Sequence, residues 1–352
     1  MKNFLLISIF CSPFLLVAQG DEEVATPFVN NYDSVRSVYI KSYPDHFFLW
    51  PVMKQRRLDF TITDLPDRDK KVAYRSNTPY AFGLGMYLFE VRLEVAVAVP
   101  LGQRSKEIYG DSDTRDLQLN LFSKKGGFEF HYQKYSGFYI DDPSVLILPD
   151  MPYPQRPDIE TRNVGFVGNY IFNNKKFSLR SSYIFMDRQL RSAGSFGLFT
   201  AINSFKTVGD SAILGERYKD DFGVDTKIKE IKTTTLGIGP GYSYNLIHEG
   251  FFANATLSVG PAHNWLSYRS ENGSKKEDSK LTVFFAARAA LGYNGDRFFT
   301  GLSYTTQGSN ARFDTIQLAS SRGVFKILFG LRFREVGFLK KKIGDLPKAL
   351  GL

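Results

Sequence analysis

The side chains best suited to proton transfer near neutral pH are the four histidines of this chain: His46, His131, His248 and His263. A hydrolase needs a nucleophile, a base and an orienting group held close together. His131 alternates with Glu129 and Gln133, so the three would share one strand face. A polar face explains that spacing without catalysis, and no GxSxG, HExxH or glycine-rich phosphate loop occurs. The sequence therefore predicts no catalytic residue and no enzyme.

Carboxylate pairs occur in two polar stretches, Asp111 with Asp113 and Asp141 with Asp142. Calcium takes several oxygen ligands from one loop, and two carboxylates without the remaining spacing do not supply them. Solvated loops that face anionic lipopolysaccharide through bridging divalent ions explain the same residues. The sequence therefore predicts no metal site and no cofactor.

Charges of both signs alternate along one predicted strand face, at Glu90, Arg92 and Glu94. Seven further polar or charged residues are expected to face the same interior: Asp116, Glu129, His131, Arg180, Arg288, Lys326 and Arg332. Mixed signs can pair across a narrow lumen, whereas a pore that selects one charge needs a ring of one sign. The set therefore predicts a lumen-lining charge network.

The elements that would hold these residues are strands, because apolar residues recur at every second position. Val91, Leu93 and Val95 share one parity, and eight further segments show the same period: 117–121, 128–132, 177–185, 236–244, 253–259, 281–291, 298–304 and 325–333. A secreted β-sandwich would turn its apolar face inward, and a membrane barrel would turn it to lipid. The period alone leaves both architectures open.

The connections between these segments alternate in length. Short turns are expected near 88–90, 124–127, 173–174, 248–250 and 294–295, and long polar connections at 64–77, 100–114, 137–157, 187–230, 269–279 and 307–319. Short periplasmic turns and longer extracellular loops are typical of outer-membrane barrels. With a first strand at 57–63, the alternation predicts a single antiparallel transmembrane β-barrel of about 12 strands. A strand at 194–205 would need a partner within 207–230 and would raise the count to 14.

The chain ends suggest export. Lys2, an apolar run over 4–17 and Ala18 have the pattern of a secretory signal peptide, predicted over 1–18. Residues 19–53 are expected to form a periplasmic segment that could plug the lumen, 54–334 the barrel, and 335–352 a basic tail. The single cysteine, Cys11, lies in the predicted signal, so no disulfide is expected. The net charge of +9 does not indicate nucleic acid as a partner, because no recognition motif accompanies it.

Five stretches resemble a known family: 39–43 (YIKSY), 135–139 (YSGFY), 192–195 (SAGS), 241–244 (GYSY) and 291–294 (LGYN). The chain is similar over about 30–335 to domain-of-unknown-function family 4421, predicted outer-membrane barrels of Bacteroidota. The resemblance implies that fold and location, and it brings no assigned activity or catalytic residue. In the family the SAGS stretch leads into a strand, which favours the alternative of 14 strands.

The expected protein is therefore a non-enzymatic outer-membrane barrel, structural or accessory to an envelope complex, in a Gram-negative bacterium. Its expected partners are outer-membrane lipid, lipopolysaccharide and other envelope proteins. A narrow channel for small or hydrophobic solutes is one alternative, and a barrel enzyme that acts on lipid is another.

Overall fold

The computed structural model describes residues 31–88, 91–148, 150–218, 222, 227–313 and 315–336. The predicted signal peptide, Glu90 and residues 337–352 of the predicted tail lie outside these ranges.

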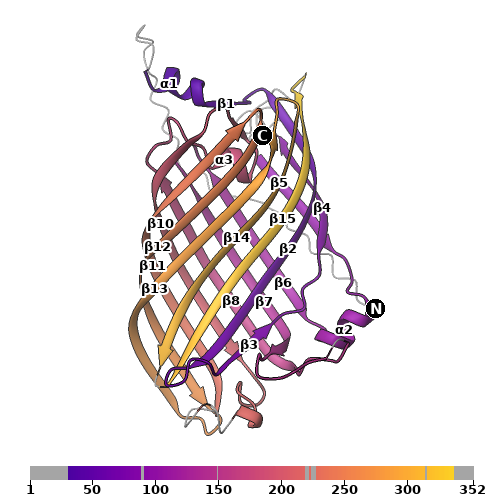
Figure 1. Ribbon diagram of the computed structural model, residues 1–352, viewed down its shortest axis with the longest axis vertical. Coiled ribbons are helices and arrows are strands. Elements are labelled where there is room, and N and C mark those ends of the chain that lie inside the picture. Colours follow the sequence, from indigo (N-terminus) through magenta and orange to yellow (C-terminus); the bar gives the residue numbers. More distant parts are fainter. Residues whose placement is uncertain are drawn as a thin grey trace, which may run out of the picture.

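A closed antiparallel barrel dominates the described chain (Figure 1). Ten strands of a 13-stranded sheet form the ring, which closes where β15 pairs with β2. They are β2 (His46–Asp64), β3 (Lys71–Arg75), β7 (Gly126–Asp141), β8 (Gln155–Ile171), β10 (Ala193–Val208), β11 (Ile228–His248), β12 (Phe251–Ser270), β13 (Lys275–Asn294), β14 (Phe298–Phe313) and β15 (Ile316–Arg334). The architecture is all-β as predicted, and a count of 12 or 14 strands is not confirmed.

Three more strands are attached to the ring: β4 (Ala81–Leu88), β5 (Val91–Ala98) and β6 (Asp113–Phe122). β4 pairs with residues 48–54 of β2, β5 pairs with β4, and β6 pairs with β7. In the part of the chain that the structure describes, β5 and β6 do not pair with each other. We call the line between these two strand edges the β5–β6 seam. Between β2 and β7 the ring is closed only by the short strand β3, which pairs with both of them.

The barrel has two ends that differ in their connections (Figure 1). At the end we call proximal lie α1 (Asn31–Tyr39), β1 (Ile40–Ser42), the end of β15, and an insertion over 172–192 that contains α3 (Arg180–Tyr183) and β9 (Asp187–Gln189). β1 pairs with β9. At the distal end lie the connection 99–112 with α2 (Gln103–Tyr109), the connection 142–154, and an insertion over 209–227 with the short helix η1 (Glu216–Tyr218).

Several features of the predicted topology differ from the structure. The prediction of a strand at 177–185 is wrong, because these residues lie in a buried insertion. Residues 194–205 do form a strand, β10, as the alternative assignment expected. Most of 269–279 and 307–319 is strand, not long loop. The first ring strand begins at His46, so residues 46–53, expected in the periplasmic segment, are part of the barrel wall. Since 172–192 is long and proximal, the predicted alternation of loop lengths is not confirmed.

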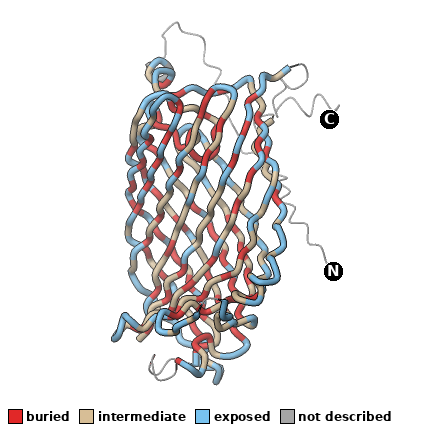
Figure 2. Tube along the Cα trace, turned by 45° about the vertical axis from the view of Figure 1, so that its right-hand side comes forward, coloured by how far each residue is buried: buried red, intermediate tan, exposed pale blue. Residues whose placement is uncertain are grey.

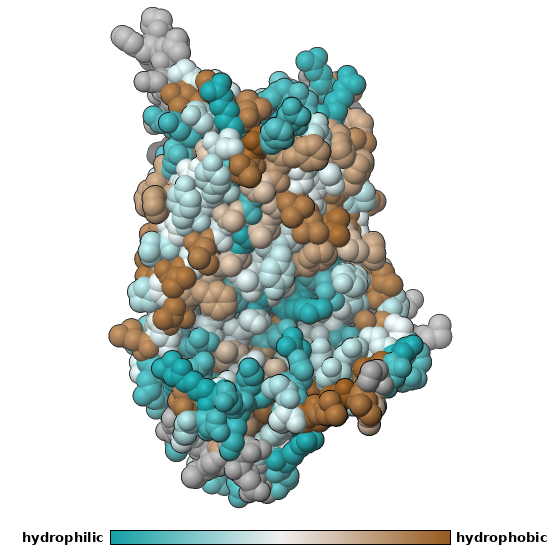
Figure 3. Space-filling model, in the orientation of Figure 1, coloured by the Kyte–Doolittle hydropathy of each residue, from teal (hydrophilic) through white to brown (hydrophobic). Residues whose placement is uncertain are grey.

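The strand faces alternate between buried and exposed, which gives the red and blue beading along the tube in Figure 2. β12 shows it over most of its length, with Phe252 buried and Phe251 exposed. Apolar residues occupy much of the outer face: Leu84, Val95, Val97, Ile202, Leu236, Ile238, Leu257, Val259, Val283 and Leu291 are among the exposed ones. Figure 3 shows brown, tan and pale side chains over the wall, with a teal group partway down it, and most teal side chains towards the two ends. Among the described helices, none is long and apolar enough to cross a membrane.

Candidate functional site: the closed lumen

A cluster of charges centred on Glu94 fills the lumen beside β2, β5 and β15. The Glu94 carboxylate accepts from Lys54 Nζ at 3.1 Å, Arg92 at 3.2 Å and Lys326 Nζ at 3.2 Å. Trp50 Nε1 also donates to it, at 3.3 Å. Gly85 makes room for the indole, because a Cβ there would lie 2.0 Å from Trp50 Cε2. One carboxylate therefore holds three cations from three strands.

A second cluster surrounds Asp116 on β6. Arg56 Nη1 donates to its carboxylate at 2.7 Å, Gln133 Nε2 at 2.7 Å and the Tyr135 hydroxyl at 3.1 Å. Asn163 Nδ2 donates to the side-chain oxygen Oε1 of Gln133 at 3.1 Å, which extends the network to β8. The cluster joins β2 to β6 across the lumen.

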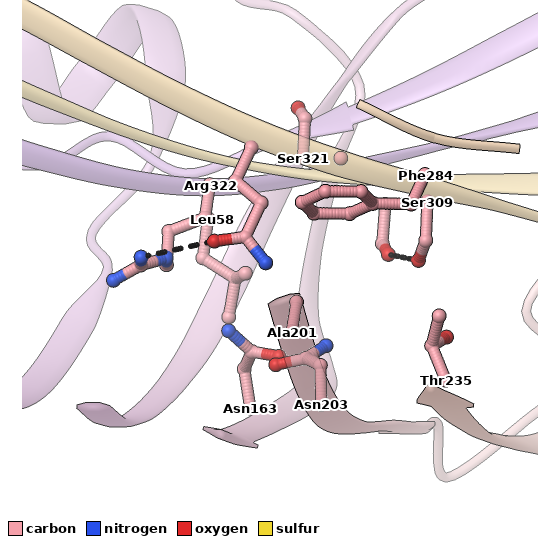
Figure 4. A pocket seen from close by; sticks show the side chains of 12 residues that line it. Leu58, Asn163, Ala201, Asn203, Thr235, Phe284, Ser309, Ser321 and Arg322 are labelled. Carbon is pink, nitrogen blue, oxygen red and sulfur yellow. Dashed lines mark hydrogen bonds between the residues drawn. The ribbon is translucent and has the colours of Figure 1, made fainter. Parts of the chain in front are cut away.

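The third cluster contains Glu129 and His131. Glu129 pairs with Arg322, which reaches across from β15. His131 Nδ1 lies 3.9 Å from Glu129, and His131 Nε2 lies 3.0 Å from Asn203 Oδ1. A small cavity of about 20 Å³ next to Arg322 is lined by polar side chains of several strands, including Asn163, Asn203 and Thr235 (Figure 4). The centre of the lumen is thus filled by side chains that bond to one another.

The proximal mouth is closed by the insertion 172–192. Phe177, Leu179, Tyr183, Ile184 and Phe185 are buried there in one apolar cluster. The wall contributes the other members of the cluster, among them Phe48, Trp50, Phe252, Phe299 and Leu328. Phe185 stacks on Phe299 with ring centroids 4.9 Å apart. Residues 177–185 therefore belong to the packing of the mouth, and Arg180–Tyr183 within them form α3 instead of a strand.

Buried charges and backbone groups anchor this insertion. Arg332 Nη2 donates to the Phe185 carbonyl at 2.7 Å and to Asn294 Oδ1 at 2.8 Å, and Arg332 lies over the Tyr43 ring at 4.2 Å. Asp187 is fully buried and accepts from Arg36 at 3.1 Å, so the segment before the barrel also holds the insertion.

The outer rim of this anchor carries two perturbed groups. Burial raises the pKa of Tyr43 to about 12, and its hydroxyl donates to Asp296 Oδ1 at 2.9 Å. The hydrogen bond from Lys41, with others from Tyr43 and Arg188, holds the pKa of Asp296 below its usual value. Both groups therefore keep one charge state at neutral pH.

The distal mouth is closed in the same way by the insertion 209–227. Its Ile213, Leu214, Tyr218 and Phe222 are buried among wall residues. That cluster includes wall residues Leu58, Phe60, Tyr74, Tyr135, Ile140, Phe205, Ile231 and Leu266. The Tyr74 hydroxyl donates to the Ile213 carbonyl at 2.6 Å. Apolar clusters therefore close both mouths around a polar centre.

The structure brings most of the predicted lumen charges together. Arg92, Glu94 and Lys326 share one cluster, Asp116 lies in the second, and Glu129 and His131 lie in the third. The other three predicted residues contact the insertion 172–192 or belong to it. Arg180 lies on α3 at 3.6 Å from Asp187, whereas Arg288 on β13 lies 6.0 Å from the Tyr183 ring centroid and Arg332 on β15 anchors Phe185.

The sequence interpretation missed Lys54, Arg56 and Arg322, which supply cations to the three clusters. Lys54 and Arg56 occupy even positions on the same strand as Phe48 and Trp50, and alternate residues of a strand share one face. This parity could have placed both cations on the inner face.

The described residues offer little catalytic geometry. No hydroxyl side chain hydrogen-bonds to His131 in the described ranges. His263 Nε2 lies 2.9 Å from Ser279 Oγ on the outer wall, but no carboxylate contacts its other ring nitrogen within the same ranges. Nor do the described residues contain a group of three or more His, Cys, Asp or Glu that could hold a metal ion.

Comparison with known proteins gives one family and several distant structures. A family model described as Domain of unknown function (DUF4421) matches residues 31–333. The chain is similar to the outer membrane protease OmpT from Escherichia coli, with 8% identity and a TM-score of 0.41 over 83% of this chain and 98% of that one. It is also similar to Ail, the attachment invasion locus protein of Yersinia pestis, with 10% identity and a TM-score of 0.19 over 83% of this chain and 99% of that one.

The Pseudomonas putida toluene transporter TodX is similar at 9% identity, with a TM-score of 0.23 over 84% of this chain and 92% of that one. These TM-scores are too low to carry an argument about fold or function, and the barrel rests on its own hydrogen-bonded ring. None of the curated proteins compared with the chain matches it.

Proposed function

The chain belongs to the DUF4421 family, and we propose that it is an integral outer-membrane barrel that neither conducts nor catalyses, with a structural or accessory role in the envelope. One observation carries this proposal: apolar clusters close both mouths of the lumen, and the chain's own insertions build them. A porin-type aqueous channel needs about 16 strands, and smaller barrels are filled by side chains. Ten ring strands and a paired, filled centre support a closed protein.

The outer surface supports a membrane location. A closed ring satisfies the backbone groups of its paired strands, as lipid requires. Exposed aromatic rings gather at the proximal rim: Phe172, Phe196, Tyr242, Phe251, Phe329 and Phe333 are among them. Such rings favour the boundary between membrane and water. Together they fit a wall that faces lipid, with lipopolysaccharide and envelope proteins as partners.

The orientation follows from the termini. The described segments nearest both chain ends lie at the proximal end, which we therefore assign to the periplasm (Figure 1). The distal insertion then faces the outside of the cell. The periplasmic side, where the sequence predicts short turns, also carries the long insertion 172–192. Absence of catalysis is supported by the lack of a nucleophile, base and carboxylate in one contact set within the described residues. A route for hydrophobic solutes is the second candidate, favoured by the unpaired β5–β6 seam.

Two measurements test the membrane placement. The mature protein should stay in the outer-membrane fraction and migrate faster on a denaturing gel when unheated, because a closed barrel resists detergent until heated. Gln103→Cys and Asn272→Cys, both exposed and distal, should label with an impermeant thiol reagent in intact cells. The matched proximal variants Lys124→Cys and Arg297→Cys should label only after the envelope is opened.

A soluble periplasmic protein would contradict the proposal, and the opposite labelling pattern would contradict the orientation. Closure itself predicts that the purified protein passes no steady current.

A further inference from the structure

A cavity of about 60 Å³ lies at the β5–β6 seam, separate from the small cavity at Arg322. Its walls come from both sides of the seam, with Ala96 and Ala98 on β5 and Thr114 and Asp116 on β6. The space exists because these inward positions carry small side chains. It corresponds to about four or five water molecules, since one water needs roughly 10–15 Å³ measured in this way. A phosphate group, with five heavy atoms, is of similar size.

Two hydrogen-bond donors at the cavity have no partner among the described residues. Thr78 lines the cavity, is 6% exposed, and its Oγ1 makes no hydrogen bond. Arg56 also lines it, and while its Nη1 is bonded to Asp116, its Nε has no partner. An unmade hydrogen bond in a buried site is costly. Both atoms could donate to the oxygen of a bound ligand.

The charges around the cavity favour an anion. The three lumen clusters of the described chain contain five cations, Lys54, Arg56, Arg92, Arg322 and Lys326, against three carboxylates, Glu94, Asp116 and Glu129. Burying cations without counter-charge is unfavourable. An anionic group in the cavity would offset part of this excess of two, and phosphate pairs well with guanidinium and ammonium groups.

The seam gives access to this cavity from the membrane side. β5 and β6 do not pair in the described ranges, so the wall there has two free edges. Asn120 pairs with Glu129 in register and thus shares its inward face, yet it is exposed. Just outside the seam, Val95, Val97 and Leu117 are exposed on the outer face. The site is therefore polar and cationic within the wall and apolar outside it.

We propose that the β5–β6 seam binds a membrane lipid with a phosphate head group. Its phosphate oxygens accept hydrogen bonds from Arg56 and Thr78 inside the wall. Its acyl chains leave through the seam and lie on Val95, Val97 and Leu117. This assignment rests on the membrane placement proposed above and adds a ligand class to it.

Native mass spectrometry of the delipidated full barrel tests the assignment. Dioleoylphosphatidylglycerol should bind at one copy per barrel, about ten-fold more tightly than dioleoylphosphatidylcholine, because its head group lacks the choline cation and leaves the phosphate as the net charge. Glycerol 3-phosphate, which has the phosphate but no acyl chain, should not compete. Equal binding of the two lipids would overturn the proposal, and so would displacement by glycerol 3-phosphate, which would point to a site for free phosphate.

Two variants locate the site. Ala96→Leu should fill the cavity and weaken phosphatidylglycerol binding about ten-fold, because the side chain takes the space of the head group. Ala286→Leu is the matched control, since Ala96 and Ala286 are both 7% exposed on inner faces and only Ala96 lines this cavity. Equal loss in both variants would contradict the proposal.

Thr78→Val keeps the shape of the side chain and removes only the unpartnered hydroxyl. It should weaken binding several-fold without lowering stability, because no internal hydrogen bond is lost. Unchanged binding in this variant would also contradict the proposal. Heat-modifiability of each sample separates the barrel proposal from the lipid-site proposal. A sample that is not heat-modifiable contradicts the barrel proposal. A heat-modifiable barrel that shows no lipid preference contradicts only the lipid site.

Discussion

Glu94→Gln is expected to lower the free energy of unfolding by about 3 kcal/mol, the lower end for breaking a buried ion pair. The carboxylate is the common partner of Lys54, Arg92 and Lys326, so its loss leaves three cations facing one another. Its side chain is 14% exposed, so some water remains to reduce the penalty. Urea unfolding in detergent, followed by heat-modifiability, measures the change.

Asp111→Asn is the control for this substitution. Asp111 pairs with Lys106 at 2.7 Å, but its side chain is 65% exposed, and exposed pairs contribute about 0–1 kcal/mol. Adding Lys326→Met to Glu94→Gln should recover part of the loss, because one unpaired cation is removed. A Glu94→Gln barrel as stable as the wild type, or a double variant that is less stable than the single one, would refute the role of Glu94.

Arg332→Leu is expected to destabilise the proximal plug by about 3 kcal/mol, since buried acceptors left without a donor cost about 1–3 kcal/mol each. Arg332 is 4% exposed, and it donates to Phe185, Gly295 and Asn294. The loosened insertion should become a trypsin substrate at Lys175, Lys176 and Arg180. The measurement is the rate of cleavage within 172–192 in the folded, detergent-solubilised barrel.

Arg334→Leu provides the comparison for this variant, because Arg334 ends the same strand two residues later and is exposed. A surface change of this kind should alter stability by no more than about 0.5 kcal/mol and leave the cleavage rate unchanged. Equal cleavage of the two variants would mean that Arg332 does not hold the insertion.

Local alternation was enough to predict most of the antiparallel strands and which face of each is apolar. The period of two is a property of the strand itself, and β12 carries it over most of its length. The same reasoning placed Arg92, Glu94 and Asp116 on the inner face, because parity along one strand assigns a side chain to a face.

Local sequence patterns do not predict which segments and side-chain pairs fill the lumen of a closed barrel. Residues 177–185 alternate like a strand, but they lie in the lumen, where both of their faces are buried. The sequence also could not predict which charged residues pair with one another, because the pairing depends on the register of all the strands around the ring. Lys326 and Glu94 are 232 positions apart in sequence. The seam escaped prediction since a missing pairing leaves no trace in the sequence of either strand.

Current through a planar lipid bilayer tests the closed barrel most directly. A porin of about 16 strands, which has an open aqueous channel, is reconstituted in parallel and should conduct, which verifies the sensitivity of the measurement. Wild-type protein that is reconstituted identically and is heat-modifiable should give no steady current, because apolar clusters close both ends of its lumen. Steady current from the wild type, of a size comparable to that of the porin, would contradict the closed barrel.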